Sequence, residues 1–495
     1  MDLFSLLLGI SFEVTHGRLR VDAVEDVVSR PEDVRPNTLF VCLPERSSAG
    51  DFDKACDRGA SIIVTERLVR TNRDITVLKV EDAHYTLSLL AANFFGRPCD
   101  RLTVIGVTGT KGKTTTASML HKLLLNVGKH CGLIGSLGFF YEGKRFEMDH
   151  DTRTPYGLQR LLLEMTDRGM DTVVMEVSSK QLRESTVAGI HFDISVLTNI
   201  SPNHLQEEDF TDFADYVRCK GRLFERCDRA VVNGDDRYIQ DVLANKSCDI
   251  FRYGLTADVD FRADNVEIID DLAHPGLAYD IYNQGRIHIE IHKLGRSNVY
   301  NSLAAYAVLH TMGYDITENA DDLNDIVIDG RAEIIKNDCG IGIVVDCAKT
   351  PLEFQQLFEM IEEYRNNRIL SVFGAVGNVR QGLRRALAKT AAVSSEICFL
   401  TEHDYGTEPP DAITEEMATY LQETGTAFEV IPDRALAIRT AIATAEAGDI
   451  VVILGKGPEH TLLRGTQAVA YSEYDAIYEA LRERKDERHV RSDHH

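Results

Sequence analysis

The stretch Gly106-Val-Thr-Gly-Thr-Lys-Gly-Lys-Thr-Thr-Thr116 decides the fold of the central part of this chain. It follows a strand-like apolar run, 102–107, and leads into a segment, 113–127, whose apolar residues recur at helical spacing. A glycine-rich turn between a strand and a helix binds phosphate, because its backbone N–H groups and the helix N-terminus point at the anion. In the common pattern four residues separate the first glycine from Gly-Lys, and this chain has Val107 at the position of that first glycine. The stretch therefore predicts a nucleotide site of a rarer spacing.

On both sides of this turn, β-like runs alternate with helical ones. Such alternation predicts an α/β fold with mostly parallel sheets covered on both faces. We expect three domains, given a typical domain size of roughly 150 residues. They are a small α/β module at 1–98, a nucleotide-binding domain at 99–328 and a Rossmann-like domain without a G-x-G-x-x-G turn at 329–485, followed by a polar tail at 486–495.

Composition narrows the class of protein. Hydrophobic residues at 44% and charged residues at 27% are typical of soluble globular chains. The net charge of −24 argues against general nucleic-acid binding, which needs clustered lysine and arginine. No run approaches the roughly 20 apolar residues of a membrane span, and we expect no signal peptide. Ten cysteines without a C-x-x-C pair favour reduced thiols in the cytoplasm over disulfides or zinc. We expect a cytoplasmic monomer without a membrane partner.

Several motifs resemble those of the Mur ligase family, most closely its MurE type, which joins an amino acid to a UDP-N-acetylmuramoyl dipeptide. The amino-terminal run Ser29-Arg30, with 39–43, is similar to that type's uridine-binding module, whereas folylpolyglutamate synthases share the ATP core but begin directly with it. The other motifs are the phosphate loop itself, Met175-Glu-Val-Ser-Ser179, Thr198-Asn199, Gly295-Arg-Ser-Asn-Val-Tyr-Asn301 and Gly455-Lys-Gly457.

The resemblance implies ATP and Mg²⁺ as cofactors and an acyl-phosphate intermediate. Lys113 would reach the β- and γ-phosphates, and Thr114 would join the Mg²⁺ shell. Asn298 and Asn301 would lie on the adenine side, while Arg331 and Asp346 would close the carboxy-terminal domain over the nucleotide. For Arg331, a salt bridge in the linker is the competing interpretation. The implied loop contacts are Gly109, Thr110, Lys111, Gly112, Lys113, Thr114 and Thr115.

Three further residues match the family's catalytic and metal positions. Glu176 is similar to the Mg²⁺ carboxylate, although an exposed glutamate at a strand end is the alternative. His204 matches a second metal-site residue, and the alternative is an ordinary lone histidine. Lys220 falls on the lysine that the family carbamylates to N6-carboxylysine, and the alternative is a solvated helix lysine. With Lys113, these are the predicted catalytic residues.

The partners implied are a UDP-linked muropeptide and a free amino acid. Their predicted contacts are Ser29, Arg30, Thr154, Ser178, Asp404, Gly455 and Glu459. Several substrate-side positions nevertheless depart from the MurE type. Its Asp-His-Leu-Asp is Asn-His-Leu-Gln at 203–206, and its Asp-Asn-Pro-Arg, whose arginine reads the distal carboxylate of diaminopimelate, is His-Asp-Tyr-Gly at 403–406. Lys349 and Asn378 also replace other residues, which indicates an altered acceptor pocket.

Three functions stay open at this point. The first is a ligase that adds an amino acid, of unknown identity, to a UDP-muramoyl dipeptide. The second is a paralogue that couples another carboxylate and amine, which the substrate-side substitutions favour. The third is a nucleotide-binding regulatory protein without catalysis, suggested by the loss of aspartate at 203 and 206. The retained Lys113, Glu176 and Lys220 argue against the third.

Overall fold

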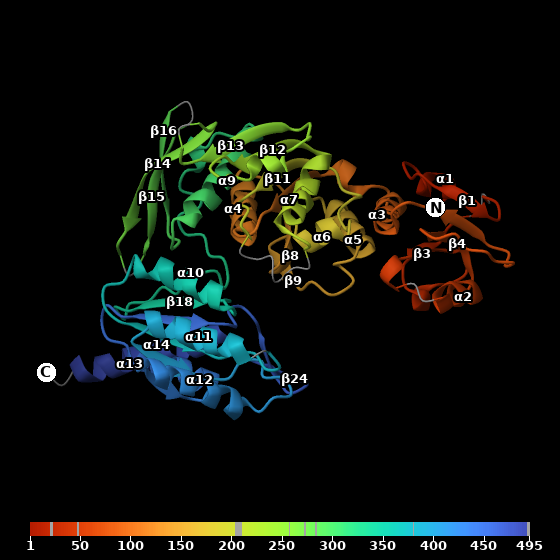
Figure 1. The fold of residues 1–495 in the computed structure, drawn as a ribbon. Helices are drawn as coiled ribbons and strands as arrows, with labels where there is room; N and C mark the ends of the chain where they lie inside the picture. The colour runs from red at the N-terminus through yellow and green to blue at the C-terminus, as the bar shows by residue number, and fades with distance from the viewer. Residues whose placement is uncertain are drawn as a thin grey trace. The chain divides into compact units, whose positions relative to one another are not determined.

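The computed structural model describes residues 1–19, 23–46, 49–202, 210–256, 258–271, 274–282, 285–379 and 381–492. The chain divides into two compact units (Figure 1). The first comprises 1–262, 282–284 and 300–319, and the second comprises the intervening segments and 320–495. The predicted α/β class is confirmed. Each of the three large sheets is mostly parallel or mixed, and its strands alternate with helices along the chain.

The amino-terminal sheet has the strand order β1-β5-β4-β3-β2 and is parallel except for β1. Its inner strand β3, which lies between β4 and β2, is buried along its whole length, as expected of a parallel strand covered on both faces. Helix α3 begins after Asp82, whose carboxylate caps the Tyr85 N–H. The elements are α1 (Leu3–Leu6), β1 (Glu13–His16), β2 (Asp26–Val28), β3 (Thr38–Cys42), α2 (Ala49–Asp57), β4 (Ala60–Thr65), β5 (Thr76–Lys79) and α3 (Ala83–Phe94).

The central sheet of the first unit is built around β6, with β10 and β11 as its parallel neighbours. Gly106 on β6 permits the close approach of Phe192, since a Cβ there would lie 2.7 Å from the Phe192 ring. The elements are β6 (Thr103–Thr108), α4 (Lys113–Asn126), β7 (Cys131–Gly135), β8 (Gly138–Tyr141), β9 (Lys144–Phe146), α5 (Pro155–Asp167), β10 (Thr172–Glu176), α6 (Ser179–Arg183), β11 (Phe192–Leu197), α7 (Phe213–Gly221), β12 (Cys227–Asn233), α8 (Ile239–Val242) and β13 (Asp249–Gly254).

Strand β14 (Phe261–Ile269) begins in the first unit and continues into the second, with β15 (Gly276–Tyr282) and β16 (Arg286–Ile291) beside it. Helix α9 (Ser297–Thr311) likewise has residues in both units. None of these three strands was predicted, and the periodicity of β14 is weak. Residues 267–269 of β14 are half-exposed or exposed, which explains the weak pattern.

The second unit contains a six-stranded sheet of order β17-β18-β22-β19-β20-β21, parallel except for β17. Apolar cores lie on both faces of this sheet. Its elements are β17 (Glu333–Ile334), β18 (Gly342–Asp346), α10 (Pro351–Glu362), β19 (Ile369–Phe373), α11 (Gln381–Ser394), β20 (Ile397–Leu400), α12 (Pro410–Thr424), β21 (Ala427–Val430), α13 (Arg434–Thr444), β22 (Ile450–Leu454), β23 (Thr461–Arg464), β24 (Gln467–Ala470) and α14 (Glu473–Ser492).

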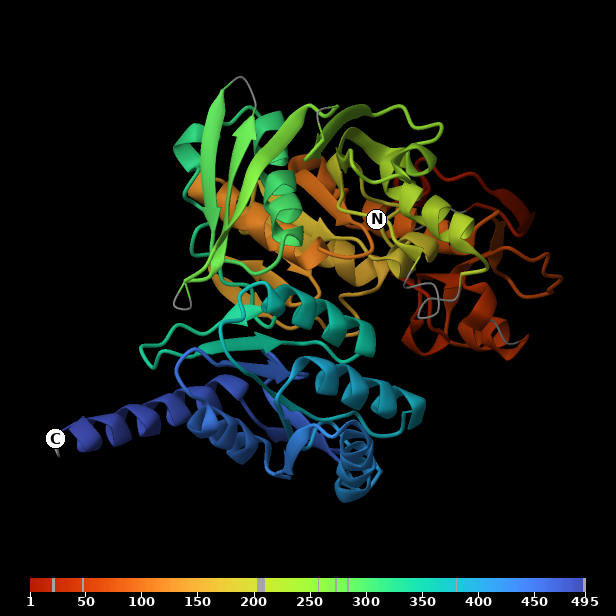
Figure 2. The ribbon, with the colours of Figure 1, turned by 60° about the vertical axis from the view of Figure 1, so that its left-hand side comes forward.

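The polar tail predicted at 486–495 differs from the structure. Helix α14 continues to Ser492 and leads away from the rest of its unit towards the C-terminus (Figure 2). Its first part is anchored by buried Ile477 and Ala480, and the polar residues continue that helix. Among the described residues, no helix is both long and apolar enough to cross a membrane.

Candidate active site

The phosphate loop connects β6 to α4, and two of its glycines are required sterically. Gly109 has a φ of +149°, and a Cβ there would lie 1.9 Å from Thr198 Oγ1. Gly112 has a φ of +79°, and a Cβ there would lie 2.3 Å from Asn301 Oδ1. A side chain at either position would displace the residue packed behind the loop, so the loop needs glycine twice.

Asn199, which follows β11, holds the loop from the side. Its backbone carbonyl accepts a hydrogen bond from the Thr110 N–H at 2.8 Å. Its side chain accepts from the Lys111 N–H and donates to the Lys111 carbonyl, both at 3.0 Å. Thr198 Oγ1 donates to the same carbonyl at 2.5 Å. The loop is therefore fixed in advance by the strand next to β6, which spares reorganisation when an anion binds.

The Lys113 side chain folds back along the loop. Its ammonium donates to the carbonyls of Gly109 and Thr110, both at 3.0 Å. Thr115, next to Thr114 on the first turn of α4, is buried at 9% exposure. The loop thus presents one ammonium and the N-terminus of α4 together, as phosphate binding requires.

Thr114 and Glu176 form the part of the site that suits Mg²⁺. Thr114 Oγ1 donates to Glu176 Oε2 at 2.9 Å, and the Ser136 N–H donates to Glu176 Oε1 at 3.0 Å. Glu176 is thus a half-buried, oriented carboxylate and not the freely exposed one of the alternative interpretation. Mg²⁺ commonly takes one or two protein oxygens and completes its shell with phosphate and water, so this donor set fits.

His204, the predicted second metal residue, lies outside the described residues. Within the part of the chain that is described, no group of three or more His, Cys, Asp or Glu side chains could hold a metal ion by itself.

Lys220 lies on α7 and is buried at 1% exposure. Its Nζ donates to Thr108 Oγ1 at 3.3 Å and lies 5.5 Å from the centroid of the Tyr216 ring. The Tyr216 hydroxyl bonds in turn to Thr110 Oγ1 at 2.8 Å. The alternative of a solvated helix lysine is therefore wrong. Burial of a lysine is costly unless its charge is used or modified, and this buried lysine lies next to the strand end that leads into the phosphate loop.

The residues predicted to contact the adenine side of the nucleotide or to close over it are divided between the two units. In the first unit, Asn301 Oδ1 accepts from Thr116 Oγ1 at 3.3 Å and supports the loop from behind. In the second unit, Asn298 caps the Leu294 carbonyl at 2.7 Å, and Asp346 accepts from the N–H groups of Ala332 and Ala348, both at 2.7 Å. Burial raises the pKa of Asp346 above its usual range.

Arg331 lies beside Asp346 in the second unit. Its Nε is buried and finds no hydrogen-bond partner among the described residues. Lys293 Nζ donates to the Arg331 carbonyl at 3.0 Å, so the backbone here is fixed while the guanidinium keeps an unused donor. A buried unused donor is a feature that a ligand could satisfy.

The predicted muropeptide contacts have local structural roles as well. Thr154 is the N-cap of α5 and accepts from the Gly157 N–H at 3.1 Å. Ser178 is the N-cap of α6 and forms a capping box with Gln181. Arg30 follows β2 and pairs with Asp33 at 2.6 Å; its neighbour Ser29 is half-buried.

The amino-terminal module has a cavity at the ends of β3 and β4. It is a cavity of about 510 Å³ that does not include Ser29 or Arg30 among its lining residues. Three arginines on one loop line it: Arg67, Arg70 and Arg73. The module therefore offers two separate places with guanidinium groups.

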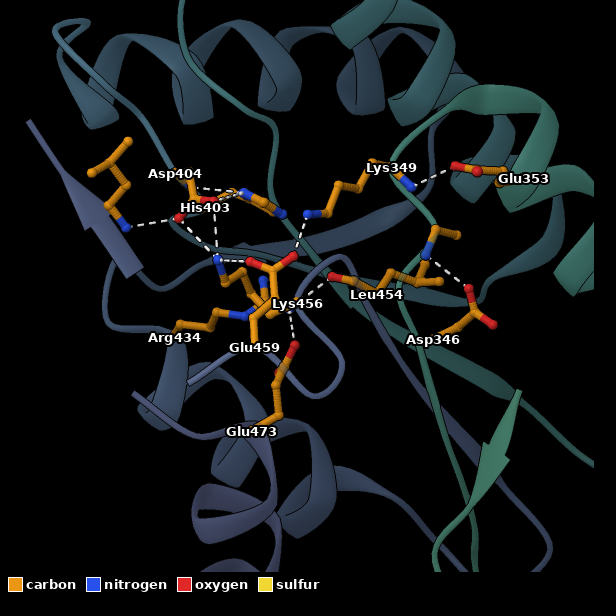
Figure 3. Close-up of polar contacts among 12 residues, drawn as sticks. Asp346, Lys349, Glu353, His403, Asp404, Arg434, Leu454, Lys456, Glu459 and Glu473 are labelled. Carbon is orange, nitrogen blue, oxygen red and sulfur yellow. Dashed lines mark hydrogen bonds and ion pairs between the residues drawn. The ribbon is translucent and has the colours of Figure 1, made fainter. Parts of the chain in front are cut away.

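The predicted amino-acid residues converge in the second unit, where β18, β20 and β22 end (Figure 3). Lys456 Nζ contacts both oxygens of Asp404 at 3.0 Å and also contacts Glu459. Lys349 Nζ donates to the other oxygen of Glu459 at 2.5 Å. Four charges thus alternate from Lys349 through Glu459 and Lys456 to Asp404, and Lys456 is buried at 2% side-chain exposure.

His403 lies behind this row of charges. Its Nδ1 accepts the Asp404 N–H at 2.6 Å, which places the ring proton on Nε2, and that nitrogen is buried without a partner among the described residues. Burial, together with the nearby positive charges, lowers the pKa of His403 to about 3. The ring is therefore a neutral donor at physiological pH. Gly455, at a φ of +118°, leaves room for it, since a Cβ there would lie 2.8 Å from His403 Cδ2.

Two residues that support the site were not predicted. Ser136 orients Glu176, and Tyr216 links Lys220 to Thr110. Ser136 sits in the turn Gly135-Ser-Leu-Gly138 after a strand, a local signal that could have indicated it. Tyr216 gave no such signal, because its contact with the loop spans 106 residues of chain.

Comparison with known proteins gives two family matches. The chain matches the Mur ligase middle domain over residues 107–309 and the Mur ligase, glutamate ligase domain over residues 330–457. UDP-N-acetylmuramoyl-L-alanyl-D-glutamate–2,6-diaminopimelate ligase 1 of Clostridium acetobutylicum is 30% identical over 490 residues, which cover 98% of this chain and 100% of that protein. The UDP-N-acetylmuramoyl-L-alanyl-D-glutamate–2,6-diaminopimelate ligase of Caldanaerobacter subterraneus subsp. tengcongensis is 30% identical over 487 residues, which cover 98% of this chain and 99% of that protein.

Solved structures are similar over most of the chain. A UDP-N-acetylmuramoyl-L-alanyl-D-glutamate–2,6-diaminopimelate ligase aligns with a TM-score of 0.74 at 24% identity, covering 98% of this chain and 99% of that one. E. coli FolC in complex with DHPP and ADP aligns with a TM-score of 0.57 at 20% identity, covering 74% and 89%. The first of these likenesses, which spans nearly the whole chain, is consistent with the predicted three-domain fold.

Proposed function

Because this chain belongs to the Mur ligase family and is an ATP-dependent ligase, we propose that it joins an amino acid to the carboxylate of a UDP-N-acetylmuramoyl dipeptide. The reaction would serve the synthesis of peptidoglycan precursors in the cytoplasm, with the protein as a monomer. Its relatives from Clostridium acetobutylicum and Caldanaerobacter subterraneus are named as ligases that act on this class of substrate. The observation that carries the proposal is the convergence of Lys113, Thr114, Glu176 and buried Lys220 around one phosphate loop.

The chemistry needs an activated carboxylate, because oxide is too poor a leaving group for amide formation. A carboxylate oxygen attacks the γ-phosphorus of ATP and ADP departs, which leaves an acyl phosphate. The amine of the amino acid then attacks the acyl carbon, loses a proton and expels phosphate. Lys113 would stabilise charge on the transferring phosphoryl group, which is usually the largest catalytic contribution. Mg²⁺ held by Thr114 and Glu176 would neutralise the phosphate charge.

Lys220 is proposed to carry a carbamate, as N6-carboxylysine. Its amine would add to CO₂ and release a proton, which converts a buried cation into a carboxylate-like anion. Such an anion could hold a second cation beside the acyl phosphate, with His204 as a further metal residue. The 1% exposure of Lys220 supports this role, since an unmodified ammonium gains little there from water.

The proposal assigns one task to each predicted domain. Residues 1–98 would bind UDP through Ser29 and Arg30, and residues 99–328 would hold ATP, with Asn298 and Asn301 on the adenine side. Residues 329–485 would bind the amino acid, and Arg331 and Asp346 would close over the nucleotide. Closure would exclude water from the acyl phosphate. The buried unused Nε of Arg331 supports such a contact. Thr154 and Ser178 would face the muramoyl peptide.

Replacing Arg30 with alanine should raise KM for the UDP-linked dipeptide about tenfold, because one charge-assisted hydrogen bond is lost, and leave kcat within about twofold. Steady-state kinetics at saturating ATP measures both. Arg67→Ala is the matched control, because it removes an exposed arginine from the cavity of the same module. If Arg67→Ala raises KM more than Arg30→Ala does, the UDP group binds at that cavity instead.

The proposed function itself is tested by incubating the protein with Mg²⁺, ATP, UDP-N-acetylmuramoyl-L-Ala-D-Glu and a panel of amino acids. We expect phosphate release equal to the amount of a new product whose mass equals dipeptide plus amino acid minus water. Phosphate release only with a different carboxylate would favour the paralogue hypothesis. ATP binding without release on any carboxylate would favour the regulatory one.

A further inference from the structure

Arg331 lies in a turn whose backbone has an unusual conformation. Gly330, before it, has a φ of +61°, and Ala332, after it, has a φ of +44°. A residue with a side chain rarely adopts a positive φ, and such a conformation persists only where the surrounding structure imposes it. The neighbours of this turn therefore fix the point at which the Arg331 side chain leaves the backbone.

Two carboxylates hold the N–H groups of the turn. The Gly330 N–H donates to Glu333 Oε2 at 2.9 Å, and the Ala332 N–H donates to Asp346 Oδ2 at 2.7 Å. Glu333 is held in turn, because the same oxygen accepts from the Tyr474 hydroxyl at 2.6 Å. The residues on either side of the arginine are thus anchored by oriented acceptors.

Lys293 holds the carbonyl of the arginine itself. Its Nζ donates to the Arg331 carbonyl at 3.0 Å, and the residue is buried at 2% exposure. Burial lowers the pKa of Lys293 to about 8, although the carboxylates of Glu333, Asp346 and Asp329 oppose this shift. The group is therefore still an ammonium at neutral pH. A buried ammonium is costly unless carboxylates and hydrogen bonds compensate it, and here both connect it to the turn.

Lys293 also connects two segments that carry predicted nucleotide contacts. It lies between β16 and α9, and the first turn of α9 carries Asn298. Asn298 is fixed by donating to the Leu294 carbonyl at 2.7 Å. The hydrogen bond from Lys293 to the Arg331 carbonyl therefore joins the start of α9, with its predicted adenine-side contact, to the turn with the predicted closing residue.

We infer that Lys293 is a positioning residue for nucleotide binding, which acts by fixing the backbone of Arg331 and so the direction of its guanidinium. The inference rests on the proposed function for the role of Arg331 in closing over the nucleotide. A contact group that is ordered in advance costs less to order when its ligand binds. Loss of the ammonium should therefore weaken ATP binding more than it slows the chemical step.

The test compares two substitutions of Lys293 on the full chain. Lys293→Met removes the ammonium and should raise KM for ATP about tenfold while kcat stays within about threefold, because one hydrogen bond that orders Arg331 is lost. Lys293→Arg keeps a charged donor, and the adjoining cavity of about 30 Å³ leaves room for its longer side chain. Its KM for ATP should stay within about threefold of the wild type.

A second background separates positioning from a general loss of packing. If Lys293 acts through the arginine, Lys293→Met should raise KM for ATP by less than about twofold when Arg331→Ala is already present. Lys336→Met is the matched control, because Lys336 lines the same small cavity but is exposed and pairs with Asp325 at 2.7 Å. An unchanged KM in Lys293→Met would overturn the inference. An undiminished rise in the Arg331→Ala background, or an equal rise in Lys336→Met, would also overturn it.

Thermal unfolding shows whether each variant is folded. Lys293→Met leaves the Glu333 carboxylate without a neighbouring cation, and a buried charge without its partner is destabilising. The double substitution Lys293→Met/Glu333→Gln removes both charges and keeps an acceptor for the Gly330 N–H. It should show the same rise in KM for ATP, and it decides the inference if Lys293→Met alone does not fold.

Failure of the proposed function is recognised separately, by calorimetry with Mg²⁺ and a non-hydrolysable ATP analogue in the absence of dipeptide and amino acid. If no carboxylate and amino acid support ligation, that function is wrong, and affinity for the analogue then decides the inference. A loss of about tenfold in Lys293→Met that disappears in the Arg331→Ala background would still support it. Equal affinity of the wild type and Lys293→Met, or no binding to the wild type, would refute it.

Discussion

Lys113→Ala is expected to lower kcat/KM for ATP-dependent ligation by about a thousandfold, the upper range for removal of one preorganised electrostatic contact. The Lys113 ammonium lies along the phosphate loop, 3.0 Å from two loop carbonyls, so it is a cation held next to the predicted phosphate position. Its loss would leave negative charge on the transferring phosphoryl group without its nearest neutralising partner. Phosphate release is measured under steady-state conditions, with the concentration of one substrate varied while the other substrates are saturating.

Lys122→Ala is the control for this prediction. Lys122 lies on the same helix, α4, but is exposed, so its removal tests the effect of losing a lysine from that helix alone. We expect kcat/KM within about twofold of the wild type, as is usual for a surface substitution away from the site. Equal losses in the two variants, or activity retained in Lys113→Ala, would remove Lys113 from phosphoryl transfer.

Lys220→Ala is expected to lower ligation by a similar factor of about a thousand and, unlike Lys113→Ala, to regain at least about tenfold when formate or acetate is added. A free carboxylate can enter the space left by the side chain and replace the carbamate anion, although it lacks the advantage of a tethered group. Titration of activity against acetate concentration measures the rescue, and mass spectrometry of the wild type at high bicarbonate looks for the added 44 Da of the carbamate.

Lys246→Ala provides the comparison for Lys220. Lys246 is also largely buried, with 14% side-chain exposure, but it pairs with Glu225 at 2.8 Å away from the phosphate loop. It should keep its activity and show no response to acetate. Thermal unfolding of both variants separates loss of chemistry from loss of the fold. Full activity of folded Lys220→Ala would refute the carbamate role.

Much of the fold could be predicted because its central strands are short apolar runs between clear helical segments. Strand β22 and strand β19 are buried throughout, and their runs of β-branched and aromatic residues occur where they were predicted. Strand β14 was missed because exposed and buried positions mix along it without a clean alternation. Strand β16 does alternate between exposed and more buried positions, and that signal was not used. The polar end of α14 was taken for a tail, since propensity alone does not reveal a helix that continues from a packed first half.

The candidate site divides in the same way. The phosphate loop was predicted from its local pattern between a strand and a helix, whereas Glu176 and Lys220 were predicted from the resemblance to the Mur ligase motifs. Contacts across the sheet, such as those of Asn199 with Lys111, depend on strand order and could not be read from spacing. The pairing of Lys349 with Glu459 joins residues 110 positions apart and emerges only when β18 lies next to β22.

The most direct test of acyl-phosphate ligation follows an oxygen atom. UDP-N-acetylmuramoyl-L-Ala-D-Glu labelled with ¹⁸O in its glutamyl carboxylates is incubated with the protein, Mg²⁺, ATP and an accepted amino acid. The ¹⁸O content of the released phosphate is then determined by mass spectrometry. One ¹⁸O per phosphate is expected, since the carboxylate oxygen that attacks the γ-phosphorus leaves with it when the amide forms. Release of unlabelled phosphate alongside the amide product would contradict the mechanism.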